Sequence, residues 1–175
     1  MVITLLWVIN RTENTYHAGI CSQVEIRSYW STDLDAIVEL ESRAFPVGPY
    51  SRRMLSAIFR NPLSFTFVAD DGGKVVGYAS VLPLDSSSAD VESIAVDPDY
   101  QGKGIGGILL ETIEKEMARR GYTRSVLEVR DKNEAAIVFY RRHGYEIISH
   151  MPRYYHELFG GSRGAYRMVK LLTTT

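Results

Sequence analysis

Four glycines occur where the chain passes from a short apolar run into a long amphipathic one. Residues 97–107 read DPDYQGKGIGG, with glycine at Gly102, Gly104, Gly106 and Gly107. Without side chains at these positions, successive backbone N–H groups can converge on an anion, helped by the dipole of the helix that follows. The segment therefore predicts a pyrophosphate cradle and a nucleotide-like ligand.

A magnesium-dependent nucleotide site does not fit this segment. The Walker pattern requires Lys followed by Ser or Thr after the last glycine, whereas Ile108 and Leu109 stand there. The four histidines have no metal-ligand spacing with one another or with the single cysteine, Cys21. We therefore predict no metal.

The dinucleotide fingerprint G-x-G-x-x-G fits at Gly102, Gly104 and Gly107. Glu128 lies about twenty residues further on, where a ribose-binding acid would stand. In that fold, however, the first glycine directly follows its strand, and here five residues separate Val96 from Gly102. Only 47 residues follow Glu128, too few for the rest of a doubly wound sheet. We therefore disfavour this interpretation.

A third pattern, Gln-x-x-Gly-x-Gly at residues 101–106, belongs to a longer match. Its parts are SIAVDPDYQGKGIG at 93–106, LEVR at 127–130, and Asn-x-x-Ala-x-x-x-Tyr-x-x-x-Gly-Tyr at 133–145. In order and spacing these segments resemble the GNAT superfamily of acyl-CoA-dependent N-acyltransferases. Within it they are most like the N-terminal protein acetyltransferases, including the ribosomal-protein alanine type. The resemblance spans about residues 24–172.

The resemblance implies an α/β (α+β) sandwich, with helices flanking a mixed, mostly antiparallel sheet whose central strands splay apart. Acetyl-CoA would lie between strands 90–97 and 124–130 as cosubstrate. Its pyrophosphate would meet backbone N–H groups of the glycine turn, and its pantetheine arm would pair with backbone at 94–96 and with Asn133. The residues so assigned are Ile94, Ala95, Val96, Gln101, Gly102, Lys103, Gly104, Ile105, Gly106, Gly107 and Asn133.

Tyr140 is the candidate general acid. When an amine attacks a thioester, the leaving sulfur gains negative charge, and a phenol aimed at it can donate a proton. Tyr140 follows Asn133 by seven residues, as in the family. The alternative is an ordinary core aromatic on an amphipathic helix.

Three carboxylates compete as the base. The resemblance to the ribosomal-protein enzymes assigns the role to Glu128, which apolar residues flank on a central strand. Asp90 and Glu92 lie two apart on the neighbouring strand and so face one side, near where other GNAT branches place a base. We also assign both to the acceptor site. Any of the three could instead pair with Arg130 or Lys103. No Ser-His-Asp arrangement is evident, so we expect direct transfer within a ternary complex.

We predict that the acceptor is the N-terminal α-amine of a protein or peptide. The reference pKa of an α-amine is about 7.8, against about 10.4 for lysine, so the α-amine is easier to neutralise. By resemblance, the peptide groove lies between the loop of Phe45 and Tyr50 and the loop of Tyr154 and Tyr155. The two latter tyrosines could instead only pack their loop. Residues 158–166 depart from the family pattern, which leaves the preferred first residue open.

Other functions remain open alongside this one. The chain could acetylate lysine or a small amine, form the CoA-binding subunit of a complex, or sense acyl-CoA without catalysis. The presence of both Glu128 and Tyr140 argues against a silent sensor. An auxiliary subunit or a homodimer also remains open.

The chemistry requires elements that position these residues, and hydrophobic periodicity supplies them. Strands are predicted at 24–29, 64–70, 74–82, 90–97, 124–130, 145–151 and 165–171, and helices at 32–44, 52–60, 105–120 and 134–142. Asn133 is expected to cap the last helix, and Gly144 to end it.

Composition fits one globular domain. The chain has 175 residues and a formal net charge of −1, without long blocks of one sign, so we predict neither nucleic-acid binding nor membrane binding. A single cysteine indicates a reducing compartment, hence the cytoplasm. We assign residues 24–172 to the domain and 1–23 to an N-terminal extension of unknown order.

Overall fold

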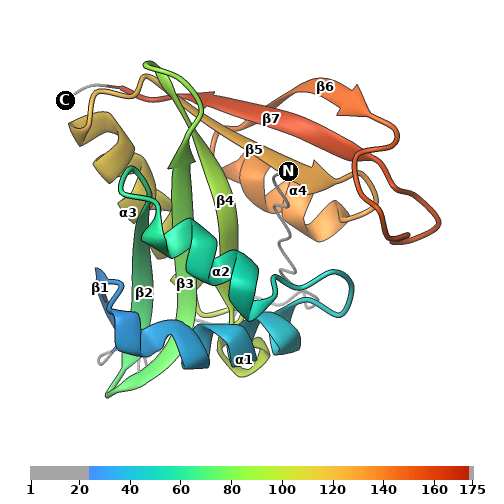
Figure 1. Ribbon diagram of the computed structural model, residues 1–175. Coiled ribbons are helices and arrows are strands. Elements are labelled where there is room, and N and C mark those ends of the chain that lie inside the picture. The colour runs from blue at the N-terminus through green and yellow to red at the C-terminus, as the bar shows by residue number, and fades with distance from the viewer. Residues whose placement is uncertain (1–23, 174–175) are drawn as a thin grey trace.

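The computed structural model describes residues 24–173, and the expectations for residues 1–23, His17 and Cys21 lie outside them. The chain forms one seven-stranded sheet flanked by four α-helices (Figure 1). The strands are β1 (Val24–Ser28), β2 (Phe65–Asp71), β3 (Lys74–Pro83), β4 (Ser88–Val96), β5 (Arg124–Arg130), β6 (Glu146–Met151) and β7 (Ala165–Leu171). The helices are α1 (Leu34–Ala44), α2 (Arg52–Arg60), α3 (Ile105–Arg119) and α4 (Glu134–Arg142).

The sheet has the order β1-β2-β3-β4-β5-β7-β6, and every neighbouring pair is antiparallel except β4 and β5. That parallel pair is short. Only Ser88, Ala89 and Asp90 are in register with β5, opposite residues 124–126. Beyond this point the two strands separate, as Figure 1 shows. The mixed sheet with a splayed central pair is thus confirmed.

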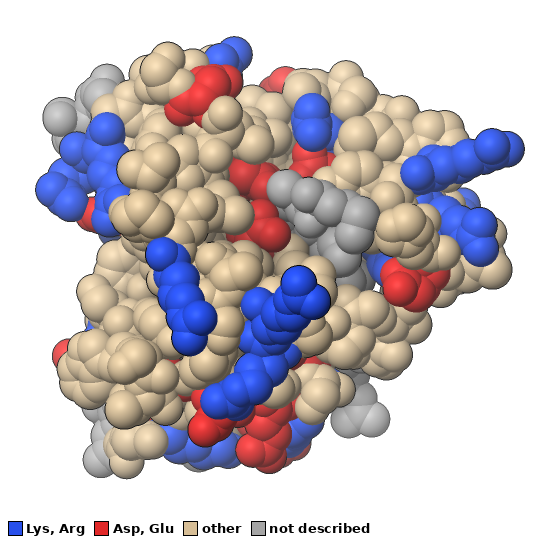
Figure 2. All heavy atoms as spheres, viewed as in Figure 1, with Lys and Arg blue, Asp and Glu red and all other residues tan. Residues whose placement is uncertain are grey.

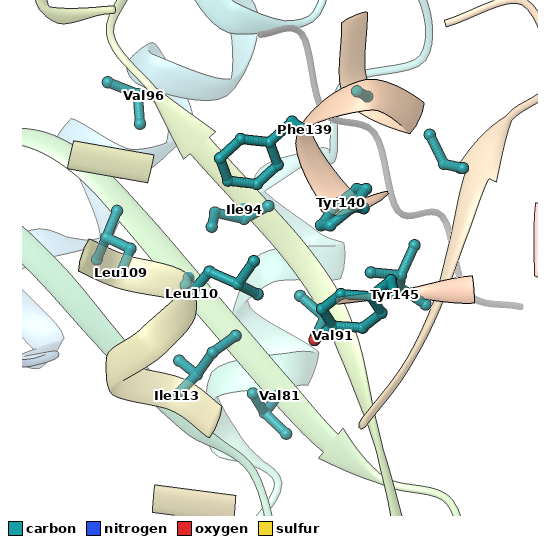
Figure 3. Packing of buried hydrophobic residues seen from close by; sticks show 14 of the residues in the cluster. Val81, Val91, Ile94, Val96, Leu109, Leu110, Ile113, Phe139, Tyr140 and Tyr145 are labelled. Carbon is teal, nitrogen blue, oxygen red and sulfur yellow. The ribbon is translucent and has the colours of Figure 1, made fainter. Parts of the chain in front are cut away.

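Each face of the sheet has its own helix layer and its own core. Helices α1 and α2 pack on one face through Ile37 and Leu55, against Val68 and Tyr78 of the sheet. Helices α3 and α4 cover the other face, where alternate residues of the same strands point (Figure 3). This alternation follows from the two-residue period of a strand, and in β5 it puts the charged side chains on one face. Leu127 and Val129 enter the α3–α4 core, so Glu128 and Arg130 face the opposite side.

A β-bulge interrupts β4 where the predicted acids lie. Ser93 pairs with Ser80, and Val91 pairs with Val81, so Glu92 is the extra residue between two registered pairs. A bulge re-aims the side chains at its position. No helix within residues 24–173 is long and apolar enough to cross a bilayer.

Candidate active site

The glycine turn leads from the end of β4 into α3. Gly102 and Gly104 have φ angles of +76° and +83°, and a Cβ added at either would meet no atom within 4 Å. Positive φ strains other residues, so glycine is required here by conformation. Gln101 donates from Nε2 to the carbonyl oxygen of Val96 at 3.1 Å and thereby ties the turn to the strand end. The turn is therefore defined in shape and open on the side of its backbone.

Of the other two glycines, Gly107 serves packing. Gly106 and Gly107 lie inside the first turn of α3, and a Cβ on them would stand 3.7 Å from Phe139 and 3.1 Å from His143. Gly107 therefore lets α3 approach α4 closely beside the turn, whereas a Cβ at Gly106 would make only an ordinary contact. The sequence pattern predicts only a cradle, and the contact with α4 gives a second reason for Gly107.

The remaining residues assigned to the cosubstrate have mixed surroundings. Ile94, Val96 and Ile105 are buried in the α3–α4 core, so along β4 only backbone is available to a ligand. Lys103 stands over the ring of Tyr100 at 4.4 Å from its centroid. Ala95 packs on the opposite side, against α1 and α2.

Asn133 begins α4, as expected. Its Oδ1 accepts a hydrogen bond from the backbone N–H of Ala136 at 3.2 Å, the usual N-cap geometry. The cap sets the start of the helix that carries Tyr140 two turns later. A contact between Asn133 and the pantetheine arm stays a prediction.

Tyr140 is fully buried, and its hydroxyl has no hydrogen-bond partner among the described residues. The ring packs edge-on against Phe139 and Tyr145 (Figure 3). Burial is the main cause that raises the pKa of this phenol well above 10, followed by the charges of Tyr155 and Asp90. The phenol therefore keeps its proton, and a buried hydroxyl without a partner is costly unless a ligand supplies one. Such a hydroxyl suits a proton donor to a leaving sulfur.

The three predicted carboxylates lie together on the face opposite the α3–α4 core. Asp90, Glu92 and Glu128 are each at most 3% exposed. Both oxygens of Asp90 and one of Glu92 lack a hydrogen-bond partner among the described residues. Burial raises the pKa of Asp90 well above 3.8, and the charges of Glu128 and Glu92 add to it. Burial likewise raises the pKa of Glu92, against a hydrogen bond from Tyr50.

Figure 2 shows acidic side chains near the centre of this face, between the part that carries α1 and α2 and the part that carries β6 and β7. Carboxyl oxygens gathered in one place can accept hydrogen bonds from a cation. An amine that arrives as an ammonium ion is a suitable guest.

Glu128 has a partner that the sequence did not suggest. Arg167 on β7 stands opposite Glu128 in the β5–β7 register, and its Nε donates to Glu128 Oε1 at 2.5 Å. The expected alternatives were Arg130 and Lys103. Arg130 instead donates to the carbonyl oxygen of Glu157, and Lys103 stacks on Tyr100. Knowledge of which strand neighbours β5 would have revealed Arg167, because cross-strand partners follow from register.

The first predicted groove loop lies between α1 and α2. Phe45 is buried in the core that α1 and α2 form with the sheet, so it anchors the loop to that core. Tyr50 donates from its phenol to Glu92 Oε1 at 2.6 Å. One of the two residues therefore packs and the other reaches the acids.

The second groove loop joins β6 to β7. Burial is the main cause that raises the pKa of the Tyr154 phenol, and the negative charge of Glu128 is the second. The phenol of Tyr154 therefore lies close to Glu128. Tyr155 is buried, with the guanidinium of Arg130 4.1 Å from its ring centroid. The sequence missed this stacked arginine. Tyr154 thus lies at the acids, and Tyr155 packs its loop onto β5.

Comparison with known proteins identifies the family of the chain. The profile of the acetyltransferase (GNAT) family matches residues 34–145. The [Ribosomal protein bS18]-alanine N-acetyltransferase of Escherichia coli K12 is 34% identical over 130 residues, which cover 74% of this chain and 86% of that protein. The N-alpha-acetyltransferase RimI of Mycobacterium tuberculosis is 35% identical over 137 residues, 75% of this chain and 84% of that one.

A solved structure is similar to this chain as well. The crystal structure of the ribosomal-protein-S18-alanine N-acetyltransferase from Escherichia coli superposes with a TM-score of 0.79 and 31% identity, covering 87% of this chain and 96% of that one. The family profile spans most of the chain, including the glycine turn, Glu128 and Tyr140. The chain therefore belongs to the acetyltransferase (GNAT) family.

Proposed function

We propose that this protein transfers the acetyl group of acetyl-CoA to the N-terminal α-amine of a protein or peptide. The observation that carries the proposal is the placement of two kinds of group around the gap between β4 and β5. The phenol of Tyr140, which has no hydrogen-bond partner within residues 24–173, comes from one face of the sheet. The acids Asp90, Glu92 and Glu128 lie on the other face. A proton donor and a proton acceptor for aminolysis of a thioester thereby stand on either side of the sheet where the two strands separate.

The residues present fit acetyl-CoA. Along β4, the backbone of residues 94–96 is out of register with β5 and can pair with an extended pantetheine arm. The turn around Gly102 and Gly104 is open at the start of α3, where N–H groups and the helix dipole favour phosphates. Bound there, acetyl-CoA supplies the activated acyl group.

The proposed reaction is a direct transfer. The neutral amine forms a bond to the thioester carbonyl carbon, and the bond from that carbon to sulfur breaks. Glu128 accepts the proton that the amine loses, while Arg167 holds the carboxylate of Glu128 in place. Tyr140 donates its proton to the departing thiolate. Asp90 and Glu92 accept hydrogen bonds from the arriving ammonium group, which gives up its extra proton to water before the attack.

The α-amine is the proposed acceptor for two reasons. The two relatives are named for alanine N-acetylation of a ribosomal protein and for N-alpha-acetylation, respectively. The reference pKa values also differ by about 2.6 units, so neutralising lysine at pH 7 costs roughly 3.5 kcal/mol more than neutralising an α-amine. A single carboxylate base suits the easier acceptor. We place the reaction in the cytoplasm, where protein N-termini emerge from ribosomes.

Matched peptides test the proposal. One has a free N-terminus and no lysine, and the other has a blocked N-terminus and one lysine. We expect the purified chain, without any auxiliary subunit, to acetylate the first peptide faster. Faster acetylation of the second would reject the α-amine as acceptor. Activity that appears only when a partner protein is added would favour a CoA-binding subunit.

Variants test the assigned roles. We expect Tyr140→Phe to lower kcat by about 100-fold, as loss of a general acid does. Turnover within a factor of two of the wild type would remove Tyr140 from catalysis. For Glu128→Gln we expect the acidic limb of the pH–rate profile to disappear. If that limb persists unchanged, the base must be sought in Asp90 or Glu92.

A further inference from the structure

One buried carboxyl group has no part in the reaction described above. Glu41 lies on the last turn of α1 and is 1% exposed. A buried carboxyl group is expensive to keep unless hydrogen bonds or a function compensate for it. Glu41 lies between the sheet and the first groove loop, so it can connect the two.

Three donors from three different parts of the chain converge on Glu41. The phenol of Tyr78 on β3 donates to Oε1, and the hydroxyl of Ser93 on β4 donates to the same oxygen at 3.2 Å. The backbone N–H of Tyr50, in the loop between α1 and α2, donates to Oε2 at 2.8 Å. The carboxyl group thus joins α1, the sheet and the loop at one point.

The chain of contacts continues from the loop to the acids. Tyr50, held by its backbone at Glu41, donates from its phenol to Glu92 Oε1 at 2.6 Å. Glu92 and Ser93 are neighbours in sequence, so the contacts close a ring through Ser93, Glu41, Tyr50 and Glu92. The bulge in β4 makes the ring possible, because the extra residue lets both Glu92 and Ser93 turn toward α1.

The ring fixes one oxygen of Glu92 and leaves the other without a partner. Glu92 Oε1 is held by Tyr50, whereas the buried Oε2 has no hydrogen-bond partner among the described residues. The charges of Glu128 and Glu92 both raise the pKa of Asp90, so the three carboxyl groups lie near one another. An oriented oxygen without a partner in this cluster is available to an N–H of the acceptor.

We propose that Glu41 is a positioning residue for the acceptor: through Tyr50 it orients Glu92, whose second oxygen then binds the incoming amine. Glu41 touches neither substrate. Its effect reaches the site through the hydrogen bonds of the ring. This inference rests on the proposed function for the identity of the acceptor, but not for the ring itself.

Steady-state kinetics with the free-N-terminus peptide test the proposal. Glu41→Gln keeps the side-chain shape but replaces one acceptor oxygen with an NH2 group. We expect its KM for the peptide to rise about fivefold, the factor typical of one lost hydrogen bond, while the KM for acetyl-CoA stays within twofold. Tyr50→Phe, which removes the bond to Glu92 Oε1, should raise the peptide KM similarly. Because the residues act in series, the double variant should be no worse than either single one.

A control separates positioning from simple loss of stability. Asp33, at the start of α1, is another buried carboxylate and pairs with Arg27 away from the acids. Asp33→Asn should destabilise the fold without raising the peptide KM. Equal effects of Asp33→Asn and Glu41→Gln on that KM would overturn the positioning role.

Amide hydrogen exchange gives a readout that needs no substrate. In Glu41→Gln we expect the Tyr50 amide to exchange at least about tenfold faster, because its acceptor is weakened. An unchanged exchange rate together with an unchanged peptide KM would refute the proposal. If the wild type acetylates no peptide, the proposed function fails, and the Tyr50 exchange rate alone decides whether Glu41 holds the loop.

Discussion

The stability of the fold should depend on pH through Glu41. Burial raises the pKa of this carboxyl group from 4.5 to about 7, and hydrogen bonds from Tyr78, Tyr50 and Ser93 oppose the rise only in part. Between these two values the folded chain holds a proton that the unfolded chain releases. The resulting stabilisation is fully present below pH 4.5 and is lost as the pH rises through 7.

The magnitude follows from the shift. A difference of 2.5 pKa units corresponds to about 3.4 kcal/mol, of which about 2.5 kcal/mol falls between pH 8 and pH 5. Solvent does not screen this contribution to the free energy of unfolding, because Glu41 is 1% exposed.

Urea unfolding of the wild type and of Glu41→Gln at both pH values isolates this contribution, since the glutamine does not titrate and other groups cancel. On going from pH 8 to pH 5, the wild type should gain about 2.5 kcal/mol relative to the variant. If the difference between the two proteins is the same at both pH values, Glu41 has an ordinary pKa and this account of its burial is wrong.

Three further outcomes are expected. Tyr140→Phe should raise the free energy of unfolding by about 1 kcal/mol even as it slows catalysis, because it removes a buried hydroxyl that no group in the described part of the chain binds; thermal unfolding measures this. Arg167→Met should cost about 1–2 kcal/mol, since it leaves Glu128 buried without its cation, and adding Glu128→Gln should recover most of the loss in urea titrations. Gly104→Ala and Gly121→Ala should each cost about 1 kcal/mol, because both glycines have positive φ and open surroundings. Only Gly104→Ala should raise the KM for acetyl-CoA, and equal KM values in both variants would contradict the cradle.

Much of the fold could be predicted from periodicity. The helices at 52–60 and 134–142 and the strands at 124–130 and 165–171 have the predicted bounds. The helix ends were predictable because Asn133, Gly144 and Pro62 mark them by local chemistry. The strand expected at 90–97 runs instead from Ser88 to Val96. Its start depends on pairing with β3 and β5, which a local pattern does not contain.

The candidate site was predictable where a motif contains it and not where distant segments meet. Glu128 and Tyr140 stand in contiguous patterns. Arg167 and Glu41 do not, because each acquires its role only when β7 or α1 reaches its partner in the fold. The bulge at Glu92 has the same origin, since a bulge is a property of two strands.

The short pairing of β4 with β5 also bears on self-association. Where the two strands separate, each has a backbone edge that the other strand does not cover. An uncovered edge at the outside of a sheet is a template on which further copies of a protein can add strands. Here the two edges face each other inside the sheet, whereas its outer edges belong to β1 and β6. A second copy of the protein would therefore meet β1 or β6 first, and the inner edges stay accessible only to a narrow, extended ligand.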